Sequence, residues 1–99
     1  MGKLVRDRIP EIIREDGRDP VVTVLGEADY RAALLEKLFE ESTELREAGV
    51  TEVAEEIADV LEVLRAIAKA HGHEWADIEK VAGAKRAERG AFLGRLYLE

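Results

Sequence analysis

The chain has 99 residues, with 15 basic and 22 acidic side chains and a formal net charge of −7 at pH 7. This length suits one small domain, which buries only about 60 to 65% of its unfolded surface and has little core to spare. The acidic balance argues against a nucleic-acid backbone as partner, because phosphate binding needs a basic surface. The absence of cysteine excludes disulfides and thiolate chemistry. There is no signal-peptide pattern and no apolar run of about 18 residues, so we expect a cytoplasmic protein without membrane contact.

The first 25 residues are expected to form one brief helix between extended segments. Pro10 suits the first turn of a helix that runs to about Glu15 and is followed by a stop at Asp16-Gly17. Upstream, Arg6 and Arg8 are either solvated or part of a basic arm that closes over phosphates. Residues 21–25, Val-Val-Thr-Val-Leu, are predicted as a short strand or extended edge.

Two consecutive helices are predicted over residues 27–48 and about 51–70, joined by a short turn. Gly49 is the usual residue just past a helix C-terminus. Thr51 is expected to cap the second helix, with Glu55 near the capping-box position. Helices joined by so short a turn pack against each other as an antiparallel pair.

The first of these helices carries a carboxylate where an apolar residue is expected. Leu38 and Leu45 belong to its buried seam, and Glu41 occupies the seam position between them. Glu44 lies about 60° from Glu41 on a helical wheel, so the two side chains share one face.

The second helix carries a matching pair of carboxylates. Glu56 borders its apolar seam, and Asp59 lies one turn further on. The predicted seam consists of Val53, Ile57, Val60, Leu64 and Ile67. Seam-to-seam packing therefore brings the two pairs together, and four half-buried like charges repel unless they are protonated or neutralised by cations. Oxygen ligands without Cys or suitably spaced His favour Mg²⁺, with Mn²⁺ as the alternative.

A third long helix is predicted over about residues 74–88, with Trp75, Ile78 and Ala82 on its buried face. Lys85 and Arg89 continue that face where the apolar stripe ends. These cations either stabilise the helix C-terminus or capture a substrate phosphate.

The last residues, 91–98, are expected to form a short extended tail after Gly90. Arg95 in this tail is a further phosphate candidate. Leu35 and Phe39 form a second apolar stripe on the helix over residues 27–48, which one partner helix cannot cover together with the first. We therefore expect a homo-oligomer, a dimer or a dimer of dimers, that buries part of this stripe.

The two carboxylate pairs and both ends of the chain resemble those of a known enzyme family. Glu40-Glu41-x-x-Glu44 followed by Glu56-x-x-Asp59 resembles the EExxE and ExxD motifs of the MazG-like all-α nucleoside triphosphate pyrophosphohydrolases. The segments 3–10 (KLVRDRIP) and 85–92 (KRAERGAF) resemble a short branch labelled phosphoribosyl-ATP pyrophosphohydrolase-like. The likeness covers nearly the whole chain, with Ala91 where a second Gly is typical of the branch.

The resemblance implies one MazG-like domain over residues 1–99, an oligomeric all-α helical bundle with short extended segments at both ends. It implies Mg²⁺-dependent cleavage of the α,β-phosphate bond of a nucleoside triphosphate to monophosphate and pyrophosphate, in a house-cleaning role. Carried over by position, the metal ligands are Glu41, Glu44, Glu56 and Asp59, and Glu40 is an outer ligand or a water-orienting base. The expected phosphate-binding residues are Lys37, Lys85, Arg89 and Arg95.

Several alternatives stay open at the level of sequence. Lys37 lies one turn before Glu41, so it either neutralises substrate phosphates or pairs with Glu40 or Glu41. A second enzyme hypothesis is hydrolysis of phosphoribosyl-ATP in histidine biosynthesis, with the same metal chemistry. A third hypothesis is a non-catalytic helical interaction module, in which the carboxylates are solvated or ion-paired and Mg²⁺ has no effect.

Overall fold

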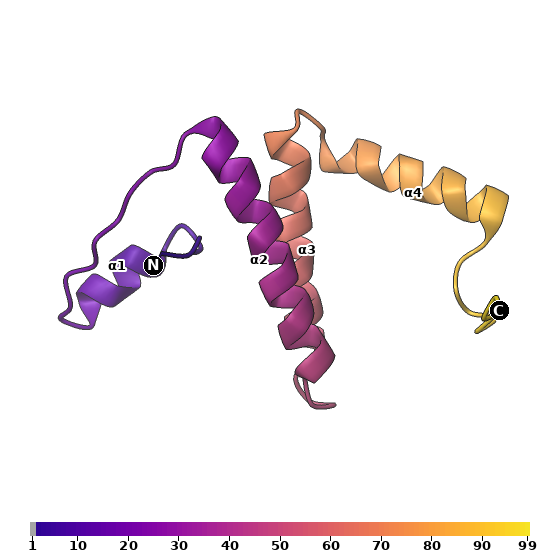
Figure 1. The fold of residues 1–99 in the computed structure, drawn as a ribbon, viewed down its shortest axis with the longest axis horizontal. Coiled ribbons are helices and arrows are strands. Elements are labelled where there is room, and N and C mark those ends of the chain that lie inside the picture. The colour runs from indigo at the N-terminus through magenta and orange to yellow at the C-terminus, as the bar shows by residue number, and fades with distance from the viewer. Residues whose placement is uncertain (1) are drawn as a thin grey trace.

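A computed structural model describes residues 2–99, which contain helices and no strand. The helices are α1 (Ile9–Glu15), α2 (Glu27–Glu47), α3 (Val53–Ala70) and α4 (Trp75–Arg89). The helices α2 and α3 lie side by side as an antiparallel hairpin, and α4 leaves the end of α3 and runs away from it (Figure 1). The expected all-α fold class is confirmed.

The ends of the long helices follow local signals. α2 begins after Gly26 with Glu27 and Asp29 in its first turn and has Arg46 in its last, which suits the helix dipole. α4 ends at Arg89 and is followed by Gly90, whose φ of 82° lies in the left-handed region that glycine adopts without strain.

The predicted strand at residues 21–25 is wrong. The segment 18–26 has no regular structure, and Val21 is 100% exposed. A strand needs a neighbour to accept its backbone hydrogen bonds, and no partner strand exists among the described residues. Without such a partner, the β-branched residues 21–25 form an irregular connection between α1 and α2.

The predicted cap of α3 is also wrong. The residue before α3 is Glu52, no side chain caps the helix, and Thr51 belongs to the preceding turn. In that turn the backbone N–H of Glu52 donates a hydrogen bond to the carbonyl oxygen of Gly49 at 2.9 Å. The turn is thus two residues longer than predicted, and the helix begins beyond the position that Thr51 could cap.

The core between α2 and α3 is thin. Its buried apolar residues are Leu34, Val63 and Ala68, and Glu41 is buried among them. On α3 the predicted seam is only partly correct, because Ile57 and Leu64 are exposed in the single chain. α3 is apolar on two adjacent faces, and the face that carries Val63 packs against α2.

α4 has no buried residue, so the burial predicted for Trp75 and Ala82 is not found within one chain. Trp75 is half-buried and Ala82 is exposed. The guanidinium of Arg65 lies 5.1 Å from the centroid of the Trp75 ring, a cation–π contact that joins the start of α4 to α3.

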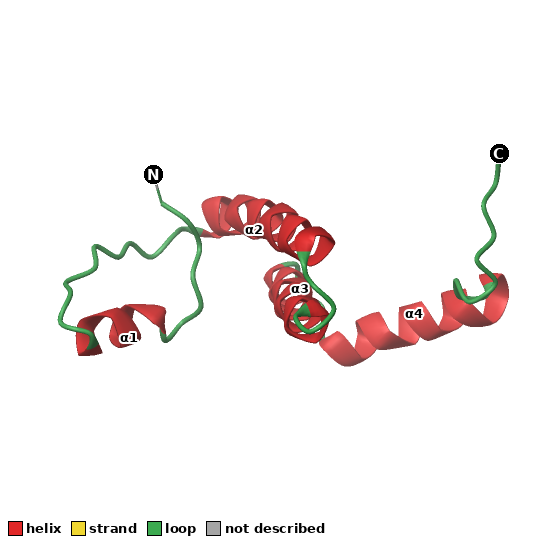
Figure 2. Cartoon of the chain, turned by 90° about the horizontal axis from the view of Figure 1, so that it is seen from below, coloured by secondary structure: helices red, strands yellow, loops and turns green. Residues whose placement is uncertain are grey.

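The overall shape is extended. From below, the N-terminal part with α1, the central hairpin, and α4 lie one after another (Figure 2). The radius of gyration is 17.0 Å, against about 13 Å for a compact chain of 100 residues. Leu35 and Phe39 remain 49% and 76% exposed, and the apolar side chains of residues 92–98 are almost fully exposed. None of the helices in the described range combines the length and apolar character needed to cross a bilayer.

Candidate functional site

Three carboxylates from the two helices of the hairpin converge at one place. Glu41 of α2 meets Glu56 and Asp59 of α3, and one oxygen from each lies within 4.8 Å of the other two. The antiparallel packing of α2 on α3 produces this arrangement, because the face of α3 that carries these acids is the one turned toward α2. We call Glu41, Glu56 and Asp59 the carboxylate cluster.

Glu41 is the buried member of the cluster, with only 7% of its surface exposed. Its Oε1 lies 3.3 Å from Nζ of Lys37, but its Oε2 is buried without a hydrogen-bond partner. The Oε2 of Glu56 is likewise buried and unpartnered. A buried oxygen without a partner costs about 1 to 3 kcal/mol, and more when it is charged. Two facing helices therefore each present an oxygen that a cation would satisfy.

Glu44 lies beside the cluster rather than in it. It is exposed, yet the neighbouring Glu41 raises its pKa above the ordinary carboxyl value, first as a hydrogen-bond acceptor for the protonated carboxyl and then through its charge. Burial, followed by the charges of Asp59 and Glu41, raises the pKa of Glu56. In both cases the charges of neighbouring carboxylates contribute to the shift, so each group feels like-charge repulsion from the others.

Lys37 is the cation that α2 contributes to the site. Its Nζ lies 3.3 Å from Oε1 of Glu40 and 3.3 Å from Oε1 of Glu41. Burial by itself lowers the pKa of Lys37, but hydrogen bonds to Glu41 and Glu40 outweigh it and raise the pKa overall. The ion pair foreseen from the sequence is thus present, and it holds Glu40 at the edge of the cluster.

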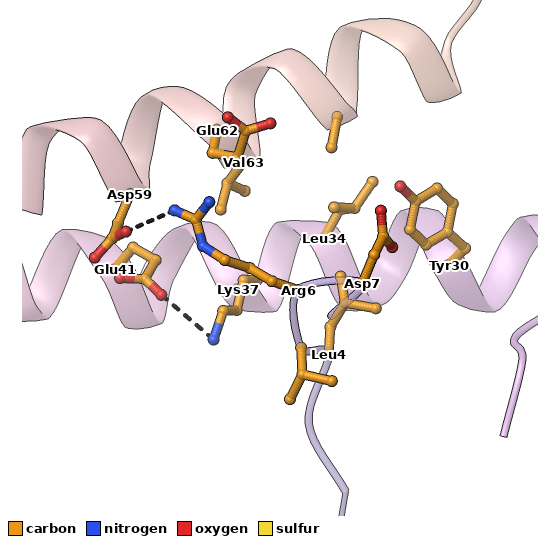
Figure 3. A pocket seen from close by; sticks show the side chains of 12 residues that line it. Leu4, Arg6, Asp7, Tyr30, Leu34, Lys37, Glu41, Asp59, Glu62 and Val63 are labelled. Atoms are coloured by element: carbon orange, nitrogen blue, oxygen red, sulfur yellow. Dashed lines mark hydrogen bonds and ion pairs between the residues drawn. The ribbon is translucent and has the colours of Figure 1, made fainter. Parts of the chain in front are cut away.

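Of the two N-terminal arginines for which the sequence left a basic arm open, Arg6 is the one that reaches the carboxylate cluster. Its Nη2 donates to Oδ1 of Asp59 at 2.7 Å, from a segment that crosses α2 toward α3 (Figure 3). Arg8 pairs instead with its neighbour Glu11 at 3.3 Å. The sequence pattern could not separate the two arginines, because side chains two residues apart in an extended segment point to the same side. Only the path of the chain in space distinguishes them.

A cavity of about 250 Å³ adjoins the cluster and is covered by the N-terminal arm, residues 4–7. Arg6, Lys37, Glu41 and Asp59 line one part of it, and the side chains of Asp7 and Tyr30 lie toward the other end (Figure 3). The remaining lining residues are Leu4, Val5, Leu34, Glu62, Val63 and Ala66. Glu62 of α3 thus borders the cavity from the side of that helix.

The other predicted phosphate-binding residues are not at the cluster of their own chain. Lys85 and Arg89 are exposed on α4, which extends away from the hairpin (Figure 1). Arg95 is exposed in the tail, with a φ of 56°. Within one chain, the structure joins Lys37 and Arg6 to the carboxylates but not these three residues.

Comparison with known proteins gives one partial relative. No family model matches the chain, and no solved structure matches it. A curated protein from Mycolicibacterium smegmatis, described as an uncharacterized protein, is 54% identical over 54 residues, which are 54% of this chain and 55% of that protein. The chain thus spans about half the length of this relative, whose description gives no activity.

Proposed function

We propose that the chain is a Mg²⁺-dependent nucleotide pyrophosphohydrolase of the MazG-like all-α group. Its reaction would cleave the α,β-phosphate bond of a nucleoside triphosphate to give a monophosphate and pyrophosphate. The observation that carries this proposal is the buried, unpartnered Oε2 of Glu41 inside a carboxylate cluster. A carboxylate kept there for stability alone would have its second oxygen hydrogen-bonded.

The donor set fits a hard divalent cation. The cluster offers only oxygen atoms, two of them without protein partners, and the pKa values of Glu56 within it and of Glu44 beside it are raised. Glu41, Glu56 and Asp59 would hold the cation, with Glu44 approaching from the side. When bound, Mg²⁺ supplies polarisation of the phosphoryl oxygens and a lowered pKa for the attacking water.

The chain's own residues have distinct tasks in this proposal. Lys37 fixes the carboxylates of Glu40 and Glu41 through its two 3.3 Å contacts and brings positive charge toward the phosphates. Glu40, at the edge of the cluster, orients the attacking water and accepts its proton. The cavity beside the cluster gives room for the base, with the apolar Leu34, Val63 and Ala66 along its wall.

A homodimer belongs to this proposal. At about 100° per residue, the exposed stripe on α2 and the exposed Ile57, Leu61 and Leu64 on α3 fall on the same side of the antiparallel hairpin. Two hairpins joined through this side would make a four-helix bundle. In such a dimer, α4 and the tail would carry Lys85, Arg89 and Arg95 toward the partner's cluster.

The test is release of pyrophosphate from a panel of nucleotides with Mg²⁺ or Mn²⁺. The panel holds ordinary and modified nucleoside triphosphates together with phosphoribosyl-ATP. We expect metal-dependent release of pyrophosphate and monophosphate from triphosphates. Activity confined to phosphoribosyl-ATP would favour the second enzyme hypothesis, and absence of release from every substrate would favour the non-catalytic module.

A further inference from the structure

One contact ties the N-terminal arm to the helical hairpin. Among the described residues, the Arg6–Asp59 pair is the one ion pair or side-chain hydrogen bond between residues 4–7 and the two long helices. It is short, at 2.7 Å, but both side chains are partly exposed, 58% for Arg6 and 37% for Asp59. A partly exposed ion pair contributes little stability, so water or another ion exchanges with it readily.

The same contact conflicts with the use of Asp59 as a metal ligand. Arg6 hydrogen-bonds Oδ1 of Asp59, and Asp59 is a member of the carboxylate cluster. A guanidinium has only donors and a permanent positive charge, so it cannot share a site with a divalent cation without repulsion. Arg6 therefore supplies positive charge to Asp59 in the state in which no metal is bound.

We propose that Arg6 is an exchangeable counter-ion of this site, an inference that rests on the proposed function. Without a divalent cation, Arg6 neutralises Asp59 and holds the arm over the cavity. When the cation takes Asp59, Arg6 moves to the substrate and binds its phosphate oxygens. Guanidinium groups suit phosphate because their paired N–H donors match two oxygens at once.

The surroundings of Arg6 support this movement. The arm lines the cavity on both sides of Arg6, through Val5 and Asp7, so a phosphate bound beside the cluster would lie within reach of the guanidinium (Figure 3). Lys37 can act on the phosphates through its charge, but Glu40 and Glu41 both hold its ammonium, so the direct hydrogen bonds to phosphate fall to Arg6. Arg6 has one carboxylate partner at the site, Asp59, whereas Lys37 has two, so Arg6 is the cation that can leave by breaking one ion pair.

The first measurement is titration with Mn²⁺ alone, followed by the electron paramagnetic resonance signal of free Mn²⁺. It compares wild type, Arg6→Gln and the control Arg8→Gln, which removes the same charge from the same segment but from a residue paired with Glu11. We expect Arg6→Gln to bind Mn²⁺ about two- to fivefold tighter than Arg8→Gln, because the ion no longer displaces a guanidinium.

The second measurement is calorimetric binding of magnesium pyrophosphate to the same three proteins. Here the effect should reverse, with binding to Arg6→Gln weaker by about tenfold or more and Arg8→Gln close to wild type. A purely structural role for Arg6 would lower the melting temperature without this opposite response of metal and phosphate.

The outcomes separate the two proposals. Equal Mn²⁺ affinity in Arg6→Gln and Arg8→Gln overturns the counter-ion role while leaving the metal site intact. Tighter Mn²⁺ binding with unchanged pyrophosphate binding overturns the transfer to phosphate. A wild-type protein that takes up no Mn²⁺ at several millimolar overturns the proposed function itself.

Discussion

At the scale of single residues, the two oxygens of Glu41 have different surroundings, and this difference decides what a substitution should do. Glu41→Gln removes one negative charge from a crowded cluster, so the stability of the metal-free protein should stay the same or rise. Activity should fall by on the order of a hundredfold or more, because water activation and phosphate bridging depend on metal placement. A pyrophosphate-release assay measures this loss.

Glu47→Gln is the matched control, since Glu47 is exposed at the end of α2 and outside the carboxylate cluster. It should retain wild-type activity. Full activity in Glu41→Gln would remove the metal-site interpretation of the cluster.

The raised pKa of Glu44 predicts a pH-dependent stability difference. A carboxyl group whose folded pKa lies above its unfolded value stabilises the fold at low pH, and this contribution is lost as the pH rises from the ordinary value of 4.5 through the raised pKa. Gln stays neutral and keeps a donor. Without divalent cations, the melting temperature of Glu44→Gln relative to wild type should therefore increase as the pH rises from about 4 to 7.

Melting curves at a series of pH values in chelator check this expectation. Glu47 lies outside the carboxylate cluster, so Glu47→Gln is the reference for the effect of removing one carboxylate from α2. A difference between Glu44→Gln and wild type that is constant across the series would contradict the account of Glu44.

At the scale of elements, the C-terminal end of α4 carries the next prediction. Arg89 is the last residue of α4 and Arg86 lies in the same turn. Removing either one should cost about 0.3 to 1 kcal/mol through the helix dipole. Only Arg89→Ala should also lower kcat/KM, because a phosphate contact appears in kinetics. If Arg89→Ala melts lower but keeps the kcat/KM of Arg86→Ala, its phosphate role is wrong.

Local signals explain why the three long helices could be predicted. Apolar periodicity and the glycines at positions 49 and 90 are local features of the sequence, and they placed α2, α3 and α4 within two residues of their observed ends. The strand at 21–25 failed because it needed a distant partner. The cap at Thr51 failed because the turn before α3 is longer than the pattern suggested.

The same distinction applies to the candidate site. Glu41 was visible because a carboxylate interrupted an apolar seam, and its burial agrees with that. Which of two apolar faces of α3 meets α2 could not be read from α3 alone, because both faces fit helical spacing. The pairing of Arg6 with Asp59 depends on the course of the arm across α2, and no local pattern carries that information.

At the scale of the whole molecule, the exposed stripe on the hairpin predicts oligomer formation. Phe39 is 76% exposed in the single chain and lies in the middle of α2. Phe39→Glu should yield monomer or insoluble protein, because it places a charge in the proposed interface. Val21→Glu is the control, since Val21 is fully exposed and outside the hairpin. Size-exclusion chromatography distinguishes the two, and an unchanged elution volume with normal stability in Phe39→Glu would count against the dimer.

The most direct test of the central claim is thermal melting of wild type and Glu41→Gln with Mg²⁺ and with chelator. An ion that binds only the folded state at ten times its Kd stabilises that state by about 1.4 kcal/mol. For a domain of this size, that corresponds to an increase in Tm of roughly 5 to 10 °C. We predict this increase in wild type and its loss in Glu41→Gln. Wild-type melting curves that coincide in millimolar Mg²⁺ and in chelator would contradict the metal site and the proposed hydrolase with it.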